Sequence, residues 1–322
     1  MKLKGSKILV TGGTGFLGSH IVQRCLEEDA RVIVFSTGKA LRNVEHLQAN
    51  PRLDLIAGDM TDAASLKKAA KGADLVMHFA SFTKTGETFS DPLKDFQVNV
   101  RGTLLLLDAM RENNVNKIVF ASTGKVYGTP QYSPVDEKHP IDPPDPYSLG
   151  KYVCEKYIAL YHKIFRFDYL ILRLFGIYGP RQIPKPGSLV GVISIFVKNI
   201  CNGEDVVIYG DGKLKRDFLY VDDFVRTCLN LLDKDLWQNT FNIASGRVVN
   251  LNELIKILAK KLESHKFKVS FKGPLKSDVD LCPDVSSLKA KIHYEPRISL
   301  EEGIGRYIQW YKQKTNYGPK AV

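Results

Sequence analysis

The segment DPPDPYSLGKYVCEK contains a tyrosine and a lysine four residues apart, Tyr147 and Lys151. This spacing places both side chains on one face at the start of a predicted helix. A free tyrosine has a pKa of about 10 and is a poor base at neutral pH, but a neighbouring ammonium group favours the phenolate. A tyrosine activated in this way can accept the proton of an alcohol while a hydride leaves the same carbon.

The context of Tyr147 selects this pair, because the spacing alone does not. The same spacing occurs twice more, at Tyr152/Lys156 and Tyr209/Lys213. Tyr147 follows a proline-rich loop and opens the helix after the apolar run KIVFAS (117–122), which leads into Thr123. Ligands of parallel sheets bind at such strand ends. We therefore predict a catalytic set of Thr123, Tyr147 and Lys151, with the Thr123 hydroxyl orienting the reacting oxygen; the alternative is that Tyr147 is an aromatic helix cap.

Three glycines, Gly12, Gly15 and Gly18, lie between an apolar run and a helical pattern in VTGGTGFLGSH. The first permits a tight turn, the second lets backbone approach a pyrophosphate, and the third lets the helix pack on the strand. The phosphates then lie at the positive N-terminus of the helix. We therefore predict a dinucleotide site rather than a ligand-free turn. The predicted contacts are Gly12, Thr14, Gly15, Phe16, Leu17 and Gly18.

The end of the second predicted strand bears on the choice between NAD and NADP. An acidic residue there normally holds the ribose hydroxyls, but this chain reads VFSTGKALRN, with Ser36 at that position. Lys39 and Arg42 follow closely enough to meet a 2′-phosphate, so NADP stays open beside NAD; a neutral ribose contact beside surface cations is the alternative. AGDMTD places Asp59 and Met60 near the adenine, or at a strand end and helix cap.

Strand-like and helix-like segments alternate through the first half of the chain. Apolar runs predict strands at 7–11, 31–35, 53–58, 74–80, 117–122 and 168–174; amphipathic patterns predict helices at 16–29, near 40–49, near 62–71, at about 92–113 and at 148–165. Continuous apolar strands separated by amphipathic helices are typical of a parallel sheet covered on both faces. With right-handed crossovers, this pattern predicts a doubly wound α/β (Rossmann) sheet.

Past residue 175 the pattern changes to short strands and loops rich in proline and glycine. Strands are predicted in VVIYG, FNIA and KVSF, and helices at 189–201, 222–232, 250–263 and 300–312. We predict a dinucleotide-binding domain over 1–175, rejoined by about 217–246, and a smaller α+β region over 176–322 that mainly binds substrate.

The composition favours a soluble, cytoplasmic protein. No apolar run approaches the length of about 20 residues that spans a bilayer. The five scattered cysteines lack a C-x-x-C pair, as expected of buried thiols in a reducing compartment, and the seven histidines show no metal-ligand spacing. The net charge of +11 fits a solvated basic surface or an anionic ligand. Without a block of like charges we expect no nucleic-acid or membrane partner, and no metal.

Further motifs extend along the whole chain, namely GDM, HFAS, NVRGT, STGKVYG, YGPRQ, IYGDGKLKRDFLYVDD and YEPRISLEEGI. With them the chain resembles the extended short-chain dehydrogenase/reductases of the NAD-dependent epimerase/dehydratase family, which includes UDP-glucose 4-epimerase. The resemblance implies NAD(P), a nucleotide-diphosphate sugar, the same catalytic set, and a homodimer formed through the helices around 92–113 and 148–165. It implies further cofactor contacts at Phe79, Ala80, Ser81, Asn99, Tyr147 and Lys151, and substrate contacts at Lys84, Thr123, Arg181, Tyr209 and Arg216.

The residues after Thr123 bear on the reaction type. In family members that dehydrate or decarboxylate the sugar, acidic groups follow this threonine, because those reactions need an acid or base beyond the tyrosine. Here the positions hold Gly124 and Lys125. The resemblance therefore implies reversible oxidation at one carbon, as in a 4-epimerase, which oxidises C4 and returns the hydride to the other face.

Two positions depart from the family pattern. Gly176 replaces the asparagine of RLFNVYG, and Leu275, beside Lys276, replaces an arginine in RPGD. Both lost side chains normally touch the sugar or diphosphate, and a lysine supplies a point charge but not a bidentate fork. Besides the epimerase, two hypotheses therefore stay open: an NADPH-dependent nucleotide-sugar 4-ketoreductase and a non-catalytic dinucleotide sensor.

Overall fold

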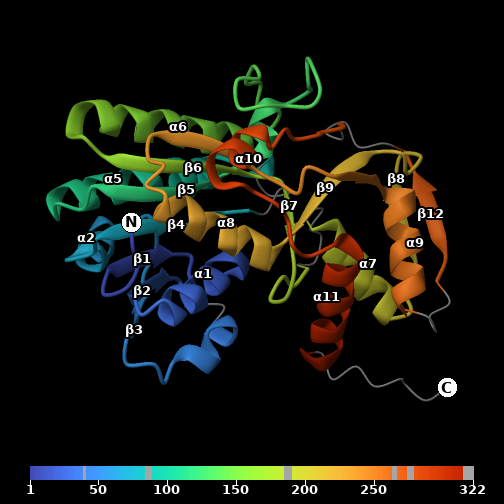
Figure 1. Cartoon of the computed structure of the whole chain (residues 1–322), viewed down its shortest axis with the longest axis horizontal. Helices are drawn as coiled ribbons and strands as arrows, with labels where there is room; N and C mark the ends of the chain where they lie inside the picture. The colour runs from blue at the N-terminus through green and yellow to red at the C-terminus, as the bar shows by residue number, and fades with distance from the viewer. Residues whose placement is uncertain (39–40, 84–88, 185–190, 263–266, 274–278, 315–322) are drawn as a thin grey trace.

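The computed structural model describes residues 1–38, 41–83, 89–184, 191–262, 267–273 and 279–314 (Figure 1). Its centre is a seven-stranded sheet with the order β3-β2-β1-β4-β5-β6-β10, in which all neighbouring strands are parallel. The strands are β1 (Lys7–Thr11), β2 (Arg31–Ser36), β3 (Leu53–Ala57), β4 (Leu75–His78), β5 (Lys117–Thr123), β6 (Asp168–Leu174) and β10 (Asn239–Ile243). The predicted doubly wound sheet is confirmed.

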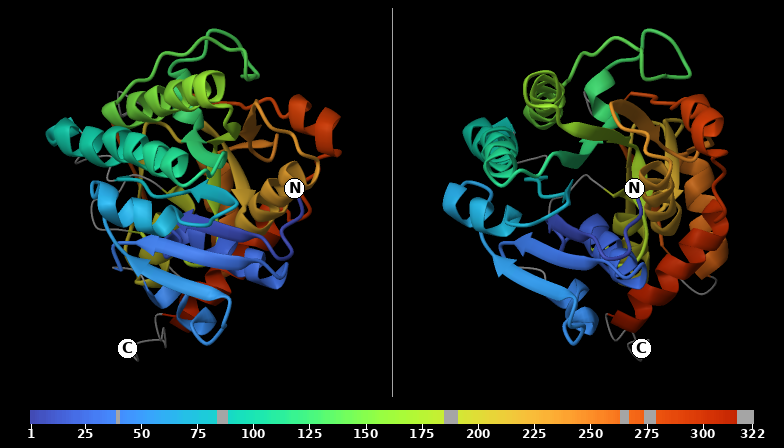
Figure 2. Two further views of the ribbon diagram at one scale, coloured as in Figure 1. Left: turned by 90° about the vertical axis from the view of Figure 1, so that its left-hand side faces the viewer. Right: turned by 60° about the vertical axis from the view of Figure 1, so that its left-hand side comes forward.

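Helices cover both faces of this sheet (Figure 2). They are α1 (Phe16–Glu27) and α8 (Val221–Asp233) on one face, and α2 (Ala63–Ala70), α5 (Gly102–Glu112) and α6 (Pro146–Phe165) on the other. Successive side chains of a strand point to opposite faces: Ile8 and Val10 join the core under α1, whereas Leu9 joins the core under α5. Burial on both faces explains why the strands are continuous apolar runs. In the described part of the chain, no helix is long and apolar enough to span a bilayer.

The helix predicted at about 92–113 is one continuous helical stretch with an irregular middle. It consists of α4 (Pro92–Asp95), a π-helical segment (Phe96–Arg101) and α5. Asp91 caps its start by accepting from Lys94 N at 3.0 Å. Because π-helical turns inside α-helices often occur at functional sites, this segment is a candidate to position functional residues.

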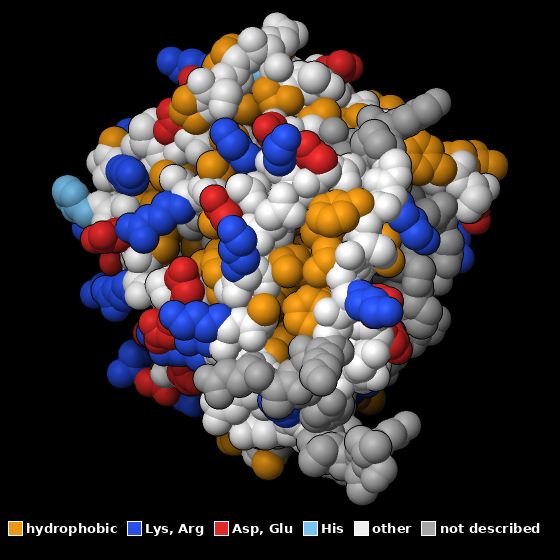
Figure 3. All heavy atoms as spheres, turned by 90° about the vertical axis from the view of Figure 1, so that its right-hand side faces the viewer, with side chains coloured by type: hydrophobic (Ala, Val, Ile, Leu, Met, Phe, Trp, Pro, Cys, Tyr) orange, Lys and Arg blue, Asp and Glu red, His pale blue; other side chains and the backbone are white. Residues whose placement is uncertain are grey.

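The second half of the chain builds two small sheets beside the main one. One has the order β11-β9-β7, and the other pairs β12 with β8. Its elements are β7 (Gly176–Tyr178), α7 (Val192–Cys201), β8 (Val206–Tyr209), β9 (Lys215–Tyr220), β11 (Val248–Asn250), α9 (Leu251–Leu262), β12 (Val269–Lys272), α10 (Ser286–Ile292) and α11 (Leu300–Lys314). On the side of the molecule that Figure 3 shows, apolar side chains gather in the middle of the surface, and charged side chains are densest on the left of the view.

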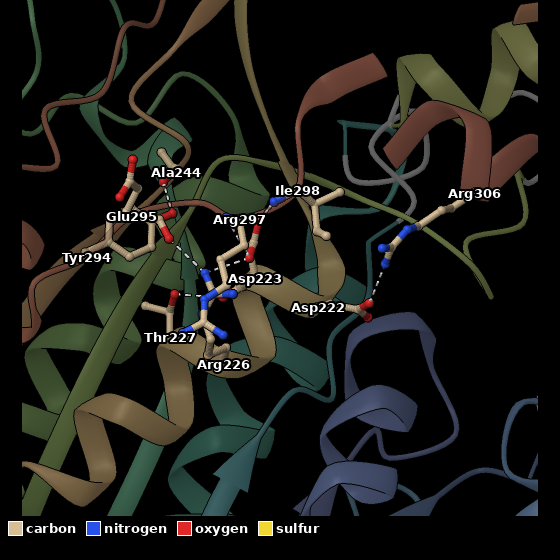
Figure 4. Close-up of polar contacts among 10 residues, drawn as sticks. All are labelled: Asp222, Asp223, Arg226, Thr227, Ala244, Tyr294, Glu295, Arg297, Ile298 and Arg306. Atoms are coloured by element: carbon tan, nitrogen blue, oxygen red, sulfur yellow. Dashed lines mark hydrogen bonds and ion pairs between the residues drawn. The ribbon is translucent and has the colours of Figure 1, made fainter. Parts of the chain in front are cut away.

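A buried carboxylate ties this second half to the main sheet (Figure 4). Asp223 in α8 has no exposed surface and accepts hydrogen bonds from Arg226 at 2.7 Å and from the backbone N–H groups of Arg297 at 3.1 Å and Ile298 at 3.0 Å. These bonds fix the segment that leads into α11. The motifs YVDD and EPRIS therefore meet as a structural anchor.

One prediction of secondary structure was wrong, and one helix was not predicted. The helix predicted near 40–49 is a pair of short 3-10 turns, Leu41–Asn43 and Glu45–Leu47, because Asn43 Nδ2 donates to Thr14 O at 2.9 Å and holds the segment against the glycine loop. This tertiary contact overrides the local helical pattern. The short helix α10 was not predicted.

Candidate active site

The glycine loop joins β1 to α1 in a conformation that side chains would obstruct. Gly12 has a φ of +68°, and a Cβ there would lie 2.6 Å from Ala80 N. A Cβ on Gly18 would lie 2.3 Å from Gly12 O. Gly15 stands at the N-cap of α1, and a Cβ there would meet Gly12 O at 3.1 Å. The three glycines thus form a tight turn, called here the glycine cradle, into the start of α1, whose first backbone N–H groups have no partner within the helix.

The other predicted cofactor residues surround this cradle at the carboxyl ends of the strands. Ser36 ends β2 and accepts from Gly38 N at 3.1 Å, while Arg42 lies exposed in the first 3-10 turn. Asp59 accepts from Thr61 N at 2.9 Å, and Met60 is buried against Gly102. Lys39 lies outside the described residues.

Phe79 and Ala80 lie where β4 meets the glycine loop. Ala80 N donates to Thr11 Oγ1 at 3.2 Å, and the Phe79 ring packs edge-on against Phe224 with the centroids 6.0 Å apart. Thr14 is buried, and Phe16 and Leu17 open α1 behind the loop. The described residues predicted for the cofactor therefore come together along one edge of the sheet.

Lys151 is a buried lysine whose ammonium group is aimed at the end of β5. Its Nζ donates to Ala121 O at 2.8 Å and lies 5.9 Å from the centre of the Tyr147 ring. Burial lowers the pKa of Lys151 to about 8, although the nearby groups of Cys154, Asp95 and Glu155 raise it. By contrast Lys156, 4.8 Å from the Tyr152 ring centre, is exposed. Burial therefore distinguishes the predicted pair from its repeat on the same helix.

The protein alone raises the pKa of the Tyr147 hydroxyl, whereas the sequence predicted a lowered pKa. Burial raises this pKa above its usual value, a hydrogen bond with Ser81 lowers it, and the carboxylates of Asp145 and Asp95 raise it. Lys151 alone therefore does not hold Tyr147 as a phenolate.

A hydrogen-bonded chain leads from Ser81 into the π-helical segment. Ser81 Oγ donates to Asn99 Oδ1 at 3.0 Å, and Phe82 N donates to the same oxygen at 2.8 Å. Asn99 Nδ2 donates to Phe82 O at 3.0 Å and to Asp95 Oδ2 at 2.9 Å. Asn99, predicted as a cofactor contact, thus uses its amide on protein groups and positions Ser81. The sequence analysis missed Asp95, for which the four-residue spacing to Asn99 was the available signal.

The neighbouring hydroxyls of Ser122 and Thr123 face different surroundings. Thr123 Oγ1 accepts from Lys125 N at 3.3 Å at the end of β5. Ser122 Oγ donates to Glu155 Oε1 at 2.5 Å, and Glu155 is paired with Arg173 at 2.7 Å. Ser122 therefore belongs to a buried ion-pair network, which leaves Thr123 as the hydroxyl at the end of β5 outside that network.

Three of the residues predicted to bind substrate, Arg181, Tyr209 and Arg216, lie on other elements than Thr123 and Tyr147. Arg181 hydrogen-bonds to Gln23 of α1 and lies 3.3 Å from His46. Tyr209 ends β8, and Arg216 in β9 donates to Val279 O at 2.6 Å. Lys84, Leu275 and Lys276 lie outside the described residues. Among the described residues, no group of three His, Cys, Asp or Glu side chains is arranged to hold a metal ion.

Comparison with known proteins agrees with this geometry. The family model described as "NAD dependent epimerase/dehydratase family" matches residues 8–244. The chain belongs to this family. It is 38% identical over 315 residues to a putative UDP-glucose 4-epimerase of Methanocaldococcus jannaschii, covering 95% of this chain and 98% of the relative.

Solved structures of family members have the same fold. The UDP-glucose 4-epimerase of Thermotoga maritima, solved with UDP-glucose, is 32% identical, with a TM-score of 0.88 over 96% of this chain and 99% of its own. The UDP-glucose 4-epimerase of Thermus thermophilus, solved with NAD, is 28% identical, with a TM-score of 0.84 over 95% and 99%.

Within this family, the structure explains both glycine departures near the catalytic set. A Cβ on Gly124 would lie 2.7 Å from the Phe175 ring, so an aromatic side chain fills the space beside Thr123. A Cβ on Gly176 would lie 2.3 Å from Asp217 O, because β7 passes close to β9 at this point. The asparagine usual in the family does not fit this backbone.

Proposed function

We propose that this protein is an NAD-dependent nucleotide-sugar 4-epimerase. The proposal rests on Thr123, Tyr147 and Lys151, which lie at the end of β5 and the start of α6, beside a glycine loop. The two residues after Thr123 supply no carboxylate, so elimination or decarboxylation has no additional acid or base there. A UDP sugar is the first candidate substrate, since the relatives named above are UDP-glucose 4-epimerases.

The residues divide the work of a reversible oxidation at C4. Tyr147 accepts the proton of the C4 hydroxyl. It returns this proton after the 4-keto sugar has rotated to present its other face. Thr123 orients that oxygen, and Lys151 supplies positive charge that favours the phenolate. NAD⁺, held by the glycine loop and Ser36, would supply the acceptor and donor of the C4 hydride, and its positive ring would add to the charge that favours the Tyr147 phenolate.

The glycine cradle fits the pyrophosphate of NAD, because Gly12 and Gly18 leave no room for side chains and α1 begins with unobstructed N–H groups. Gly12, Gly15 and the first turn of α1 would hold the phosphates. Ser36 would contact the adenosine ribose. NADP is the alternative that Ser36 and the exposed Arg42 support, and thermal stabilisation by each dinucleotide distinguishes the two.

Incubation of the purified protein with UDP-glucose, UDP-galactose and their N-acetyl forms, without added cofactor, tests the epimerase. The expected result is interconversion of C4 epimers, abolished by Tyr147→Phe. Absence of C4 epimers across a broad panel of nucleotide sugars contradicts it. Stoichiometric oxidation of added NADPH by a 4-keto sugar identifies the ketoreductase instead, and cofactor binding without any turnover identifies a sensor.

We also propose a homodimer formed through the helices at 92–112 and α6. Their outer surface exposes large apolar side chains, for example Leu93 at 74% and Ile164 at 59%. Exposed apolar patches of this kind usually mark a protein–protein interface. The further exposed members are Phe96, Leu149, Tyr157 and Leu160. Leu160→Glu is expected to convert a dimer to a monomer in light scattering.

The division of labour along the chain is a related proposal. Residues 1–175 with about 217–246 would bind the dinucleotide, supported by β10 completing the main sheet, and the rest of 176–322 would bind the sugar nucleotide. A cytoplasmic location is supported by the five free cysteines.

A further inference from the structure

Lys125 connects the two elements that carry the reactive hydroxyls. Its backbone N–H donates to Thr123 Oγ1 at 3.3 Å, and its Nζ lies 3.6 Å from Asp145 Oδ2. Asp145 is the N-cap of α6 and stands two residues before Tyr147. The backbone of Lys125 is therefore tied to Thr123, and its ammonium group lies at the N-cap of the helix that carries Tyr147.

The ion pair with Asp145 leaves much of this ammonium group available. The Lys125 side chain is 45% exposed, whereas that of Asp145 is 2% exposed. Asp145 Oδ1 accepts from Ser148 N at 2.7 Å and from Ser148 Oγ at 2.8 Å, so the carboxylate is fixed behind the lysine. A separation of 3.6 Å is longer than the 2.7–2.9 Å or so of a charge-assisted hydrogen bond. Lys125 can therefore donate to a second anion on its open side.

The surroundings of Lys125 make it the polar group that a sugar substituent next to C4 meets. Gly124 offers no side chain, and the Phe175 ring forms an apolar wall behind it. In the pose that the proposed function implies, O4 lies at Thr123 and Tyr147, and the neighbouring C5 substituent lies on the side of Lys125. In a neutral hexose this substituent is CH₂OH, and in a hexuronate it is a carboxylate.

We propose that Lys125 recognises the carboxylate of a nucleotide-linked hexuronate, so that the preferred substrate is an acidic rather than a neutral sugar. This inference rests on the proposed 4-epimerase function, because that function places C4 at Tyr147. The carboxylate gives the half-exposed ammonium group of Lys125 a charge-assisted hydrogen bond. The hydroxyl of a neutral hexose forms only a weaker hydrogen bond with it.

Two substrate pairs that differ only at C6 test the proposal. Epimerisation of UDP-glucuronate and UDP-galacturonate is compared with that of UDP-glucose and UDP-galactose, for the wild type, Lys125→Met and Lys138→Met. Lys138 is an exposed lysine of the loop before α6 and serves as the matched control. We expect kcat/KM to favour the uronates, and Lys125→Met to lower it about ten- to a hundredfold for the uronates only. Lys138→Met should leave both pairs unchanged.

If Lys125→Met lowers kcat/KM equally for acidic and neutral sugars, the inference is overturned. Lys125 would then serve to support Asp145, and the proposed 4-epimerase function would be unaffected. If the wild type turns over neither pair, the proposed function does not hold for these UDP sugars, and calorimetric binding decides on Lys125. Tighter binding of UDP-glucuronate than of UDP-glucose, lost in Lys125→Met, supports recognition, and equal binding overturns it. Should Lys125→Met not fold, Lys125→Arg is expected to keep the preference for uronates and Lys125→Gln to lose it; an unchanged preference in Lys125→Gln would overturn the inference.

Discussion

Two buried polar clusters begin at adjacent residues of β5 and differ in how their charges are matched. The ion-pair network starts at Ser122 and runs through Glu155 and Arg173 to Tyr127. Arg173 donates to Glu155 at 2.7 and 3.2 Å and to Tyr127 Oη at 2.9 Å. Burial lowers the pKa of Arg173, but the contacts with Glu155 outweigh it and raise the pKa above its usual value.

The catalytic cluster of Thr123, Tyr147 and Lys151 lacks such matching. Lys151 donates to a neutral carbonyl group, and burial depresses its pKa to about 8. The comparison shows that the cation of the network is matched by a buried carboxylate, whereas the proposed catalytic cluster keeps a costly buried charge for which the proposed chemistry would have a use. Variants in the two clusters should therefore fail in different assays.

The largest effect is expected for Tyr147→Phe, which removes the proton acceptor. The kcat for C4 epimerisation should fall by about 10²- to 10⁴-fold, with the free energy of unfolding changed by no more than about 1 kcal/mol, since one hydroxyl and its hydrogen bond are lost. Activity and urea unfolding measured on the same preparation check this. Tyr152→Phe, on the same helix, is the matched control and should retain activity. A comparable loss of activity in Tyr152→Phe would contradict a special role for Tyr147.

Arg173→Met tests the other cluster. It leaves the Glu155 carboxylate buried without its cation, so we expect the free energy of unfolding to fall by about 3–5 kcal/mol. Urea unfolding measures it, and the exposed pair of Arg24 with Glu28 supplies the control: Arg24→Met should cost about 1 kcal/mol or less. Similar values for the two variants would refute the structural role of the network.

The pH dependence of activity sharpens the comparison further. Lys151 loses its proton above its folded pKa of about 8, so kcat/KM should decline above about pH 8. Because this pKa lies below the unfolded value, the unfolded chain binds more protons between about pH 8 and 10.5, and the contribution of Lys151 to stability rises with pH in that window. Lys151→Arg should move the alkaline limb of a stopped-assay pH profile upward, whereas an unmoved limb would assign it to another group.

The smallest effect is expected for Asp95→Asn. Burial raises the pKa of Asp95 to about 6, so the group is ionised at about pH 8 and raises the pKa of Lys151. Its removal should shift the alkaline limb to lower pH. Asp91→Asn, which retains the helix cap, should leave the profile in place, and a shift of equal size there would show that net charge rather than proximity matters.

The main sheet was predictable from the sequence because its strands are buried on both faces, so that runs such as RVIVF carry their own signal. The glycine cradle was also predictable, because each of its glycines is required by local steric contacts. Asn43 was missed because its contact with Thr14 is not visible in the local pattern, and Asp95 was missed because only its four-residue spacing to Asn99 marks it. The pKa of Tyr147 likewise depends on burial that spacing does not report.

Gly176 also limits how this protein can change over evolutionary time. Its Cβ position coincides with the backbone of β9, so restoring asparagine in one step would push two strands apart before any sugar contact was regained. A chain that already has glycine at this position therefore cannot regain asparagine by a single substitution without a clash. Return to the family pattern would require compensating substitutions in β9 first, and directed evolution of sugar preference should begin there.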